Sequence, residues 1–388
     1  MIKYLDNEDF CIRDNNIVIE HADVYPRGSR YCRSSNVARE LFGSEYLQVY
    51  NLDCSTGKYA VLSSGMNAIA ALITVIVKNN PDKIIVYGNE LYCDTPRVFE
   101  YLKCKSKIFD IRKSNDILNY FEEMGDNISL FFLESCTNPS GQMFDFNIME
   151  QLLYFAPNCL FCVDNTWCTG YGFNPFPLHI DFVVESATKS ISAGKCIGGI
   201  ILGKRSNKVD IIMDDIDEWI RIYGQFVGKD HCHIFRMGIK TMKHRLEYIS
   251  KKSLKLAKYL ENNDNVNRVM FPTLKSHPTF KVSTQFLKLH PGCIWFHVNH
   301  DKSNDQIKKL VLKLAASQND ILFETSYGSK YCKIDPWPEN KRSNAYDIEQ
   351  QNIGKKGIWF RLSVGYEFDI KTTILQLEKM LEYFKFQQ

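Results

Sequence analysis

The sequence predicts an α/β protein whose larger domain contains a mostly parallel sheet and whose smaller domain is α+β. Between residues 58 and 205, short apolar stretches recur, with helical stretches between several of them. Most of the apolar stretches are continuous rather than alternating, as is typical of strands covered on both faces. The chain has 388 residues, of which 45% are hydrophobic. It is therefore long enough for two or three folding units.

Six strands and two helices are expected in the larger domain, which we place at residues 58–250. The strands are expected at residues 83–87, 106–110, 128–133, 160–163, 180–184 and 197–202. Apolar residues have helical spacing at residues 66–78 and 148–155. This alternation is typical of βαβ units, whose strands are parallel.

The pattern changes after residue 250, which indicates a second, α+β domain over residues 251–388. Amphipathic helices are expected at residues 253–260, 305–316 and 371–386, and strands near residues 266–270, 293–298 and 357–364. Residues 1–57 have no strong pattern. We expect them to form an N-terminal arm that crosses the body of the protein or a partner subunit.

Composition excludes several classes of protein. The 48 Lys and Arg residues nearly balance 45 Asp and Glu residues, giving a net charge of +3. This balance gives no electrostatic reason to expect a nucleic acid or an anionic membrane. No apolar run approaches the roughly 18–20 residues that cross a bilayer. The acidic N-terminus has no apolar signal segment, so we expect a cytoplasmic protein.

The 13 cysteines are expected to be mostly unpaired thiols in the core of a protein from a reducing compartment. Cys159 and Cys162 have C-x-x-C spacing, but they flank a strand and no second pair lies at zinc-finger spacing. No metal site is expected there.

Polar residues follow the expected strands at the sheet edge where parallel sheets bind ligands. Asp164 and Lys189 follow two strands, and a Ser-Ser-Gly run at residues 63–65 precedes a helix. Taken singly, these are an ordinary helix cap, a solvated lysine and a capping turn. Together, a glycine-led helix N-terminus can bind phosphate, a carboxylate can pair with a pyridine nitrogen and a lysine can form a Schiff base. This combination favours pyridoxal 5'-phosphate (PLP) as cofactor.

A second motif points to different chemistry. Ser186 and Lys189 have the S-x-x-K spacing of penicillin-binding proteins and β-lactamases. Those enzymes also need S-D-N and K-T-G elements, which this sequence lacks; residues 240–242 (KTM) are the nearest approach. We therefore do not favour this interpretation.

From about Tyr31 to the C-terminus, the sequence resembles the Cys/Met-metabolism PLP-dependent enzymes, the cystathionine γ-synthase and γ-lyase family of fold type I. Eight short motifs match in the correct order, and the order makes the resemblance specific. They lie at residues 31–36, 63–66, 92–95, 134–139, 163–166, 186–189, 236–241 and 361–365.

The resemblance implies two catalytic residues. Lys189 matches the lysine that bonds to the cofactor and later acts as the base that removes the substrate Cα proton. Such a lysine must be partly neutral, so its pKa must be lowered by burial or by nearby positive charge. Tyr92 matches the tyrosine that stacks on the cofactor ring and donates or accepts a proton.

The resemblance also implies a set of cofactor-binding residues. Asp164 would pair with the pyridinium nitrogen, and Asn138 would lie near the phenolic oxygen. The phosphate would be bound by the N–H groups of Gly65 and Met66 and by the side chains of Ser186 and Thr188. Tyr31 and Arg33 reach the phosphate from a neighbouring subunit in this family, which implies a homo-oligomer, a dimer or a tetramer of two such dimers.

The substrate half of the site departs from the family pattern. Arg361 is the expected bidentate clamp on the α-carboxylate of a small amino-acid substrate. The segment that contains Ser326 and Tyr331 would line the distal end of the substrate. Tyr331 would stand where γ-lyases often have glutamate. The glycine-rich segment after the lysine (residues 192–196) and residues 37–38 also differ from the family.

We expect PLP-dependent elimination or replacement at Cγ of a sulfur amino acid or an activated homoserine, with elimination marginally favoured by the length of the chain. A C–S β-lyase, a catalytically silent homologue that serves as a binding subunit, and a fold type I aminotransferase are the alternatives. Retention of Lys189, Asp164, Tyr92 and Arg361 argues against a silent homologue. Three cysteines near site motifs are candidates for a role beyond packing: Cys93, Cys136 and Cys332.

Overall fold

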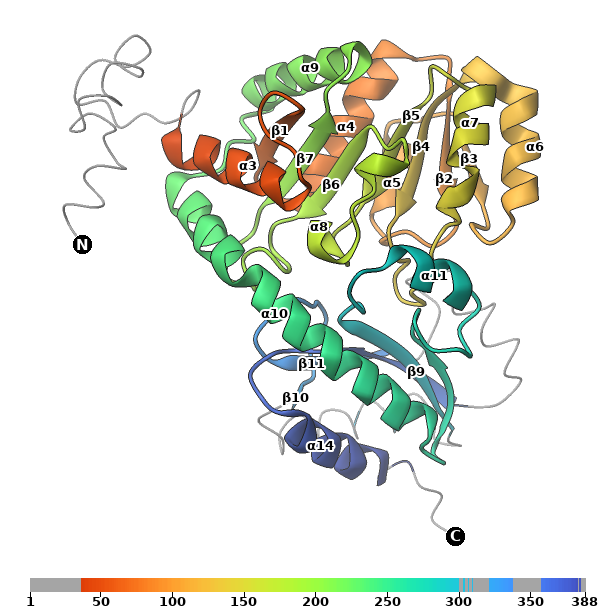
Figure 1. The fold of residues 1–388 in the computed structure, drawn as a ribbon, viewed down its shortest axis with the longest axis vertical. Helices are drawn as coiled ribbons and strands as arrows, with labels where there is room; N and C mark the ends of the chain where they lie inside the picture. The colour runs from red at the N-terminus through yellow and green to blue at the C-terminus, as the bar shows by residue number, and fades with distance from the viewer. Residues whose placement is uncertain are drawn as a thin grey trace, which may run out of the picture.

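The computed structural model describes residues 36–299, 321–337 and 357–382, together with residues 303, 306, 309 and 384. The expected phosphate ligands Tyr31 and Arg33 lie outside the described residues, and so does nearly all of the helix expected at residues 305–316. Figure 1 shows two sheets, one in each half of the described chain, joined by a single long helix, α10.

The larger sheet has seven strands in the order β1-β7-β6-β5-β4-β2-β3. Neighbours from β6 through β3 are parallel, whereas β7 runs antiparallel to both β6 and β1. The expected mostly parallel sheet is therefore confirmed. The strands are β1 (Gly57–Leu62), β2 (Ile84–Gly88), β3 (Ser106–Phe109), β4 (Ile128–Glu134), β5 (Leu160–Asp164), β6 (Phe182–Ser186) and β7 (Gly199–Lys204).

Helices cover both faces of this sheet, which explains why its strands are continuously apolar. The residues of one core cluster come from α3, α6, α7 and the start of α10, and those of the other come from α4, α5 and α9. The bounds are α3 (Val37–Val49), α4 (Gly65–Asn79), α5 (Thr95–Tyr101), α6 (Ser114–Met124), α7 (Met149–Phe155), α9 (Asn207–Tyr223) and α10 (Lys229–Glu261). A short helix, α8 (Thr169–Gly172), follows β5.

The smaller sheet has five strands in the order β10-β11-β12-β9-β8. Its core is shared with the second half of α10 and with the C-terminal helix α14. The elements are β8 (Val266–Met270), α11 (Phe280–Phe286), β9 (Cys293–Asn299), β10 (Ile321–Leu322), β11 (Cys332–Trp337), β12 (Gly357–Ser363) and α14 (Ile370–Glu382).

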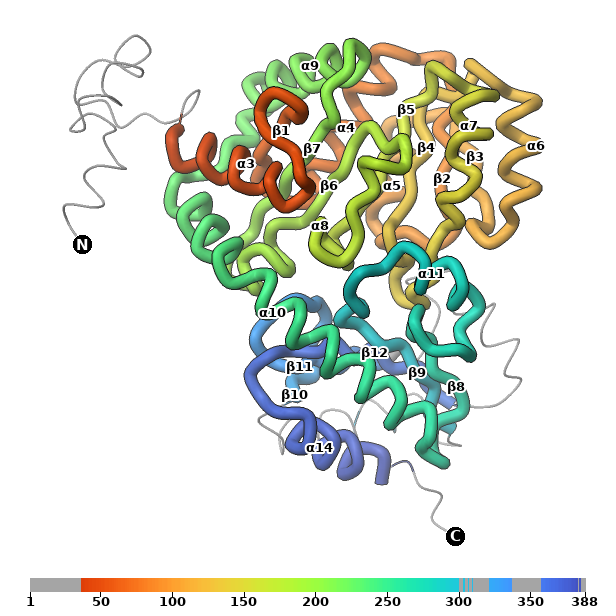
Figure 2. The backbone as a smooth tube through the Cα atoms, viewed as in Figure 1, coloured from red at the N-terminus to blue at the C-terminus, as the bar shows by residue number. Residues whose placement is uncertain are grey.

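The long helix α10 crosses the domain boundary expected at residue 250. Phe235 near its start is buried in the core of the larger domain, and Leu256 near its end is buried in the core of the smaller one. No proline separates the two apolar segments, and Gly238 between them lies inside the helix, so the chain continues as one helix of 33 residues (Figure 2). Similarly, α3 falls within the expected arm of residues 1–57 but packs against β1 and α10.

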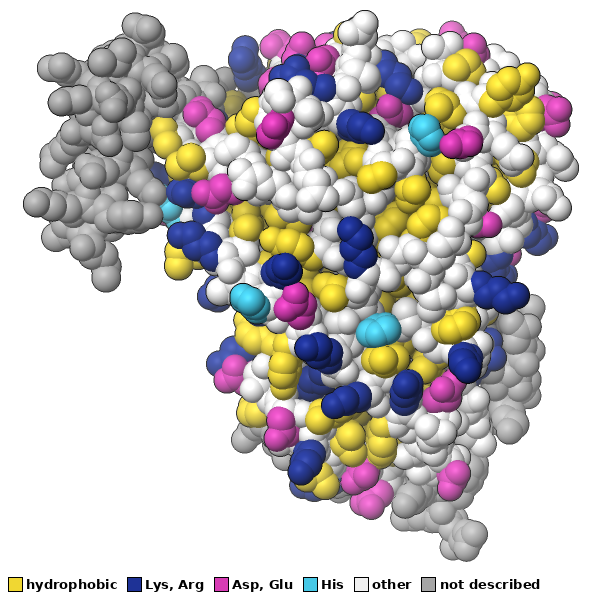
Figure 3. All heavy atoms as spheres, viewed as in Figure 1, with side chains coloured by type: hydrophobic (Ala, Val, Ile, Leu, Met, Phe, Trp, Pro, Cys, Tyr) yellow, Lys and Arg dark blue, Asp and Glu magenta, His cyan; other side chains and the backbone are white. Residues whose placement is uncertain are grey.

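On the face shown in Figure 3, basic and acidic side chains are interspersed over both halves of the molecule. Among the described residues, no helix is long and apolar enough to cross a membrane.

Candidate active site

A cavity of about 320 Å³ lies at the carboxyl ends of β4, β5 and β6, beside the N-terminus of α4. The smaller domain contributes to it through residues 325–327 and β12. Ten of the residues expected at the site line this cavity: Gly65, Met66, Tyr92, Asn138, Asp164, Ser186, Thr188, Lys189, Ser326 and Arg361.

The N-terminus of α4 forms one wall of the cavity. The Ser64 hydroxyl caps the helix by accepting the N–H of Asn67 at 3.1 Å. Gly65 packs so closely on β6 that a Cβ atom there would lie 2.8 Å from the Cβ of Ser186. Thr188 is held nearby, because its hydroxyl accepts the N–H of Gly198 at 3.1 Å. A glycine-led N-terminus of a 15-residue helix, with two hydroxyl side chains beside it, suits a phosphate group.

Lys189 lies in the turn that follows β6, and its side chain points to the smaller domain. Its Nζ atom donates to the Ser326 hydroxyl at 2.8 Å and lies 5.2 Å from the ring centroid of Tyr327. Burial, and then the positive charge of Arg361, lowers the pKa of the Lys189 amine. A lowered pKa leaves more of the amine neutral, which is the form that acts as nucleophile or base.

Asp164 ends β5 and faces the same cavity. Its Oδ1 atom accepts the N–H of Thr166 at 3.0 Å and the Thr166 hydroxyl at 2.5 Å, whereas Oδ2 accepts neither. Burial raises the pKa of this carboxyl, but the Thr166 hydrogen bonds and the charge of Lys189 act against that rise. The carboxylate is therefore oriented to pair with a cationic group in the cavity.

Arg361 lies on β12 and is 4% exposed. One of its terminal nitrogens donates to Asn138 Oδ1 at 2.9 Å, and the other donates to the Thr325 hydroxyl at 3.2 Å and lies 3.7 Å from Asp335. Arg361 thus links the smaller domain to the turn that follows β4. A planar guanidinium at this position can bind a carboxylate through two parallel hydrogen bonds.

Tyr92 lies in the loop after β2, and 40% of its surface is exposed. Its backbone N–H donates to the carboxyl of Glu134, which lies at the end of β4. Burial, and then the acidic groups of Cys93 and Asp94, raises the pKa of the Tyr92 phenol. The phenol therefore retains its proton at neutral pH and can donate it.

Tyr331 does not line the cavity. Its ring lies 6.0 Å from that of Phe368, and Lys330 Nζ lies 5.2 Å above it. The smaller domain instead contributes Thr325 and Tyr327 on either side of Ser326. Both were missed at the sequence level, where the only signal was their position next to Ser326.

Further lining residues also had no role assigned from the sequence, and three of them are acidic or aromatic. These three are Glu134, Trp167 and Glu185. Glu134 is the first residue of the motif at residues 134–139, Trp167 directly follows the motif at residues 163–166, and Glu185 directly precedes Ser186. Position relative to a motif was thus the available signal for all three.

The cysteines differ in their surroundings. Cys136 lines the cavity, and its sulfur lies 3.7 Å from that of Cys168. Cys93 is exposed, and Cys332 is buried with its sulfur 3.5 Å from Lys252 Nζ. Within the described part of the chain, no group of three His, Cys, Asp or Glu side chains could hold a metal ion.

Comparisons with known proteins give a family match that spans most of the chain. The family model for "Cys/Met metabolism PLP-dependent enzyme" matches residues 16–381. An O-succinylhomoserine sulfhydrylase of Pseudomonas aeruginosa is 28% identical over 223 residues, which cover 57% of this chain and 53% of that protein. A cystathionine gamma-lyase of Dictyostelium discoideum is 25% identical over 362 residues, which cover 91% of this chain and 87% of that protein.

A solved structure of cystathionine gamma-lyase from Lactobacillus plantarum, complexed with L-serine, superimposes with a TM-score of 0.77 at 20% sequence identity. The match covers 93% of this chain and 90% of that one. The predicted fold class is therefore confirmed.

Proposed function

Because the chain belongs to the Cys/Met metabolism PLP-dependent enzyme family, we propose that it catalyses elimination at Cγ of a small sulfur-containing amino acid. The observation that carries the proposal is the convergence of Lys189, Asp164 and Arg361 on one cavity. Replacement at Cγ of an activated homoserine uses the same residues and is the closest alternative reaction.

The residues of the cavity fit PLP. The close approach of Gly65 to Ser186 leaves a backbone cradle for the phosphate at the N-terminus of α4. Asp164 lies at the end of β5, where its carboxylate would hold the pyridine nitrogen in its protonated form. Lys189 has the lowered pKa that bonding to the cofactor aldehyde requires. When bound, PLP supplies an electron sink for the negative charge that develops at Cα.

Arg361 and Lys189 would act on the substrate in turn. The Arg361 guanidinium would bind the α-carboxylate through two hydrogen bonds, and this contact would orient the Cα–H bond. Lys189 Nζ, held at the Ser326 hydroxyl, would then remove the Cα proton. Arg361 and Lys189 both line this cavity, so substrate binding and proton transfer need no large movement of the chain.

Tyr92 would donate the proton that the sulfur leaving group needs. Its raised pKa means that the phenol carries this proton when the substrate arrives. Its half-exposed position at the cavity supports this role, because a thiol released there would reach solvent directly.

The lining of the cavity supports a substrate with an uncharged side chain. Among the described lining residues, the cationic side chains are Lys189 and Arg361, and each already has a role. A substrate with a second carboxylate would need a further cationic partner. A thioether or thiol side chain has no such requirement, which favours a methionine-like substrate over a succinylated one.

The test is a product assay on the PLP-loaded protein with methionine, cysteine, cystathionine and O-acyl homoserines. We expect 2-oxobutyrate, ammonia and a thiol in equal amounts from methionine, and no product from Lys189→Ala. Pyruvate from cystathionine would assign cleavage to Cβ and contradict the proposal. Absence of any 2-oxo acid would also contradict it. A replacement product from an O-acyl homoserine and an added thiol, formed in place of a 2-oxo acid, would assign the alternative reaction.

We also propose that each site is shared between two subunits. We further propose that the protein is cytoplasmic. The proposal of a shared site rests on Tyr31 and Arg33, which match family residues that reach a neighbouring phosphate. The cytoplasmic proposal rests on the cysteines that are buried in the core of the described residues, a usage typical of a reducing compartment. Sedimentation analysis should show that the wild type is at least dimeric. The absorbance of bound PLP should show that its occupancy falls in Arg33→Ala. A fully occupied monomer would contradict the shared site.

A further inference from the structure

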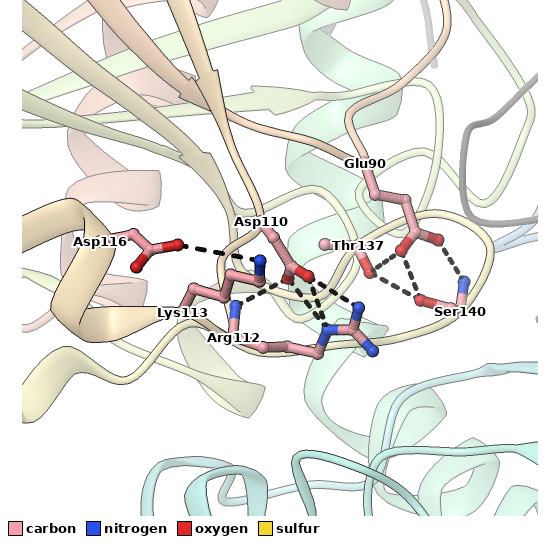
Figure 4. A network of polar contacts seen from close by, with 7 residues as sticks. All are labelled: Glu90, Asp110, Arg112, Lys113, Asp116, Thr137 and Ser140. Atoms are coloured by element: carbon pink, nitrogen blue, oxygen red, sulfur yellow. Dashed lines mark hydrogen bonds and ion pairs between the residues drawn. The ribbon is translucent and has the colours of Figure 1, made fainter. Parts of the chain in front are cut away.

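A buried carboxylate lies outside the cavity, on the loop that follows β2. Glu90 is 2% exposed, and its side chain points to the turn after β4 (Figure 4). Its Oε1 atom accepts the N–H of Ser140 at 2.7 Å. Its Oε2 atom accepts the hydroxyl of Ser140 at 2.5 Å and that of Thr137 at 3.0 Å. One carboxylate therefore accepts three hydrogen bonds from a single turn.

These contacts fix the turn on both sides of Asn138. Thr137 and Gly141 close the turn, because the N–H of Gly141 donates to the Thr137 carbonyl at 2.8 Å. The Thr137 hydroxyl also accepts the N–H of Gln142 at 2.9 Å. Asn138 is therefore bracketed by two residues, Thr137 and Ser140, that both donate to Glu90.

The bracketed residue contacts the expected substrate clamp. Asn138 Oδ1 accepts a hydrogen bond from Arg361 at 2.9 Å. Glu90 is thus connected to the guanidinium in two steps. It is hydrogen-bonded to the turn that carries Asn138, and Asn138 is hydrogen-bonded to Arg361. A second carboxyl connects the same two segments, with the acceptor now on the β4 side. Glu134 at the end of β4 accepts the backbone N–H of Tyr92, which lies in the loop after β2. The loops that carry Tyr92 and Asn138 are therefore cross-linked by two buried carboxyl groups.

We propose that Glu90 is a positioning residue that sets the Arg361 clamp through the Asn138 turn. A buried carboxylate is costly to desolvate, and an apolar side chain would fill the same space at lower cost. An apolar side chain could not hold the hydroxyl and N–H donors of this turn, and charge-assisted hydrogen bonds of this kind are directional. The inference rests on the proposed function, because it assigns to Arg361 the binding of an amino-acid carboxylate.

The test measures binding rather than turnover. L-Norleucine has an α-carboxylate and no leaving group, and n-pentylamine is the same molecule without the carboxylate. Calorimetry on the PLP-loaded protein should show that Glu90→Ala weakens norleucine binding about tenfold, the effect of losing roughly one hydrogen-bonded contact, and leaves n-pentylamine binding unchanged. Glu90→Gln retains a carbonyl acceptor for the Ser140 N–H and should recover part of the norleucine affinity.

A double-mutant cycle tests whether the effect passes through Asn138. In an Asn138→Ala background, Glu90→Ala should weaken norleucine binding further by less than about twofold, since coupled residues are not additive. Asp181→Ala is the matched control. Asp181 is another carboxylate that accepts a backbone N–H, that of Phe161 at 2.9 Å, but it precedes β6 at the opposite edge of the sheet. It should lower the melting temperature without changing norleucine affinity.

Three results would overturn the inference alone: unchanged norleucine affinity in Glu90→Ala, equal weakening of both ligands, or full additivity with Asn138→Ala. A wild-type protein that binds norleucine no better than n-pentylamine would contradict the carboxylate clamp itself. That result would overturn the proposed function together with this inference. The two failures are therefore distinguishable in one set of titrations.

Discussion

Lys189 and Arg361 line the same cavity, and the repulsion between their positive charges bears on the chemistry expected of each. Burial and then the charge of Arg361 lower the pKa of Lys189. The planar guanidinium presents its N–H donors in a fixed fork that matches a carboxylate. These properties are the basis for proposing Lys189 as the base and Arg361 as the carboxylate clamp.

Arg361→Lys should raise the KM for amino-acid substrates by about 10- to 100-fold with a smaller change in kcat. Lysine keeps the charge but loses the two-pronged geometry, and an imperfectly paired carboxylate costs about 1–3 kcal/mol. Steady-state kinetics check this prediction. Arg112→Lys, at an ion pair with Asp110 outside the cavity, is the control and should leave KM unchanged. An unaltered KM in Arg361→Lys would remove the clamp role.

The site residues were predictable where a strand end fixes them. Asp164 and Lys189 follow two strands that are adjacent in the sheet, so the topology alone brings them together. Tyr331 was not predictable in this way. Ser326 and Gly328 both have positive φ, at 87° and 79°, and the lining ends at Tyr327. Sequence spacing carries no information about such a turn.

At the scale of elements, the segment of residues 325–328 joins the smaller domain to Lys189. A Cβ atom at Gly328 would lie 2.7 Å from the backbone carbonyl carbon of Lys189. The carbonyl of Ser326 accepts the Ser363 hydroxyl from β12 at 2.9 Å. These two contacts add to the hydrogen bonds that Ser326 and Thr325 accept from Lys189 and Arg361. Together the four contacts fix the segment.

Gly328→Ala should displace this segment and reduce kcat/KM by about tenfold or more. The added methyl group meets backbone atoms that cannot rotate away, and a small misplacement at a catalytic group is costly. Gly224→Ala is the matched control, because Gly224 also has positive φ, at 66°, but its Cβ would meet nothing within 4 Å. The control should lose a little stability and retain activity. Equal activity in the two variants would show that the segment does not position Lys189.

Helix α3 is anchored by a buried carboxyl at the end of β6. Glu185 accepts the Tyr46 hydroxyl at 2.7 Å and also that of Tyr50. Burial raises the pKa of Glu185 from 4.5 to about 8, although the two tyrosine hydrogen bonds act against the rise. Between pH 4.5 and about pH 8, Glu185 is protonated in the folded protein but ionised in the unfolded chain. The stability of the protein therefore falls as the pH rises from about 4.5 to about 8.

Glu185→Gln should remove this part of the pH dependence. The difference in unfolding free energy between pH 5.5 and pH 8 should shrink by an amount on the order of 1–3 kcal/mol in urea titrations. Glu122→Gln, at an exposed position on α6, should leave the difference unchanged. A Glu185→Gln protein with the full wild-type pH dependence would refute the assignment.

Strand positions were predictable because their apolar runs are continuous, whereas helix boundaries were less so. The strand expected at residues 128–133 is β4, Ile128–Glu134, whose residues are all buried. The expected helix at residues 253–260 is only the last part of α10. The earlier part of α10 packs against α3, and the sequence does not reveal that partner.

At the scale of the whole molecule, the cavity is formed jointly by both halves of the chain. The parallel sheet supplies Lys189, Asp164 and the Asn138 turn, and the smaller sheet supplies Arg361 and Ser326. The fold class and the cofactor were predictable because the motifs occur in order along the sequence. The contacts between the halves were not, since they depend on how α10 joins the two sheets.

Locating the covalent link between protein and cofactor tests the proposed site most directly. Purified protein incubated with PLP is reduced with borohydride, digested and analysed by mass spectrometry. We predict one pyridoxyl-modified residue, Lys189, and loss of the modification in Lys189→Arg. A protein that takes up no PLP, or one modified at a different lysine with Lys189 unlabelled, would contradict this prediction.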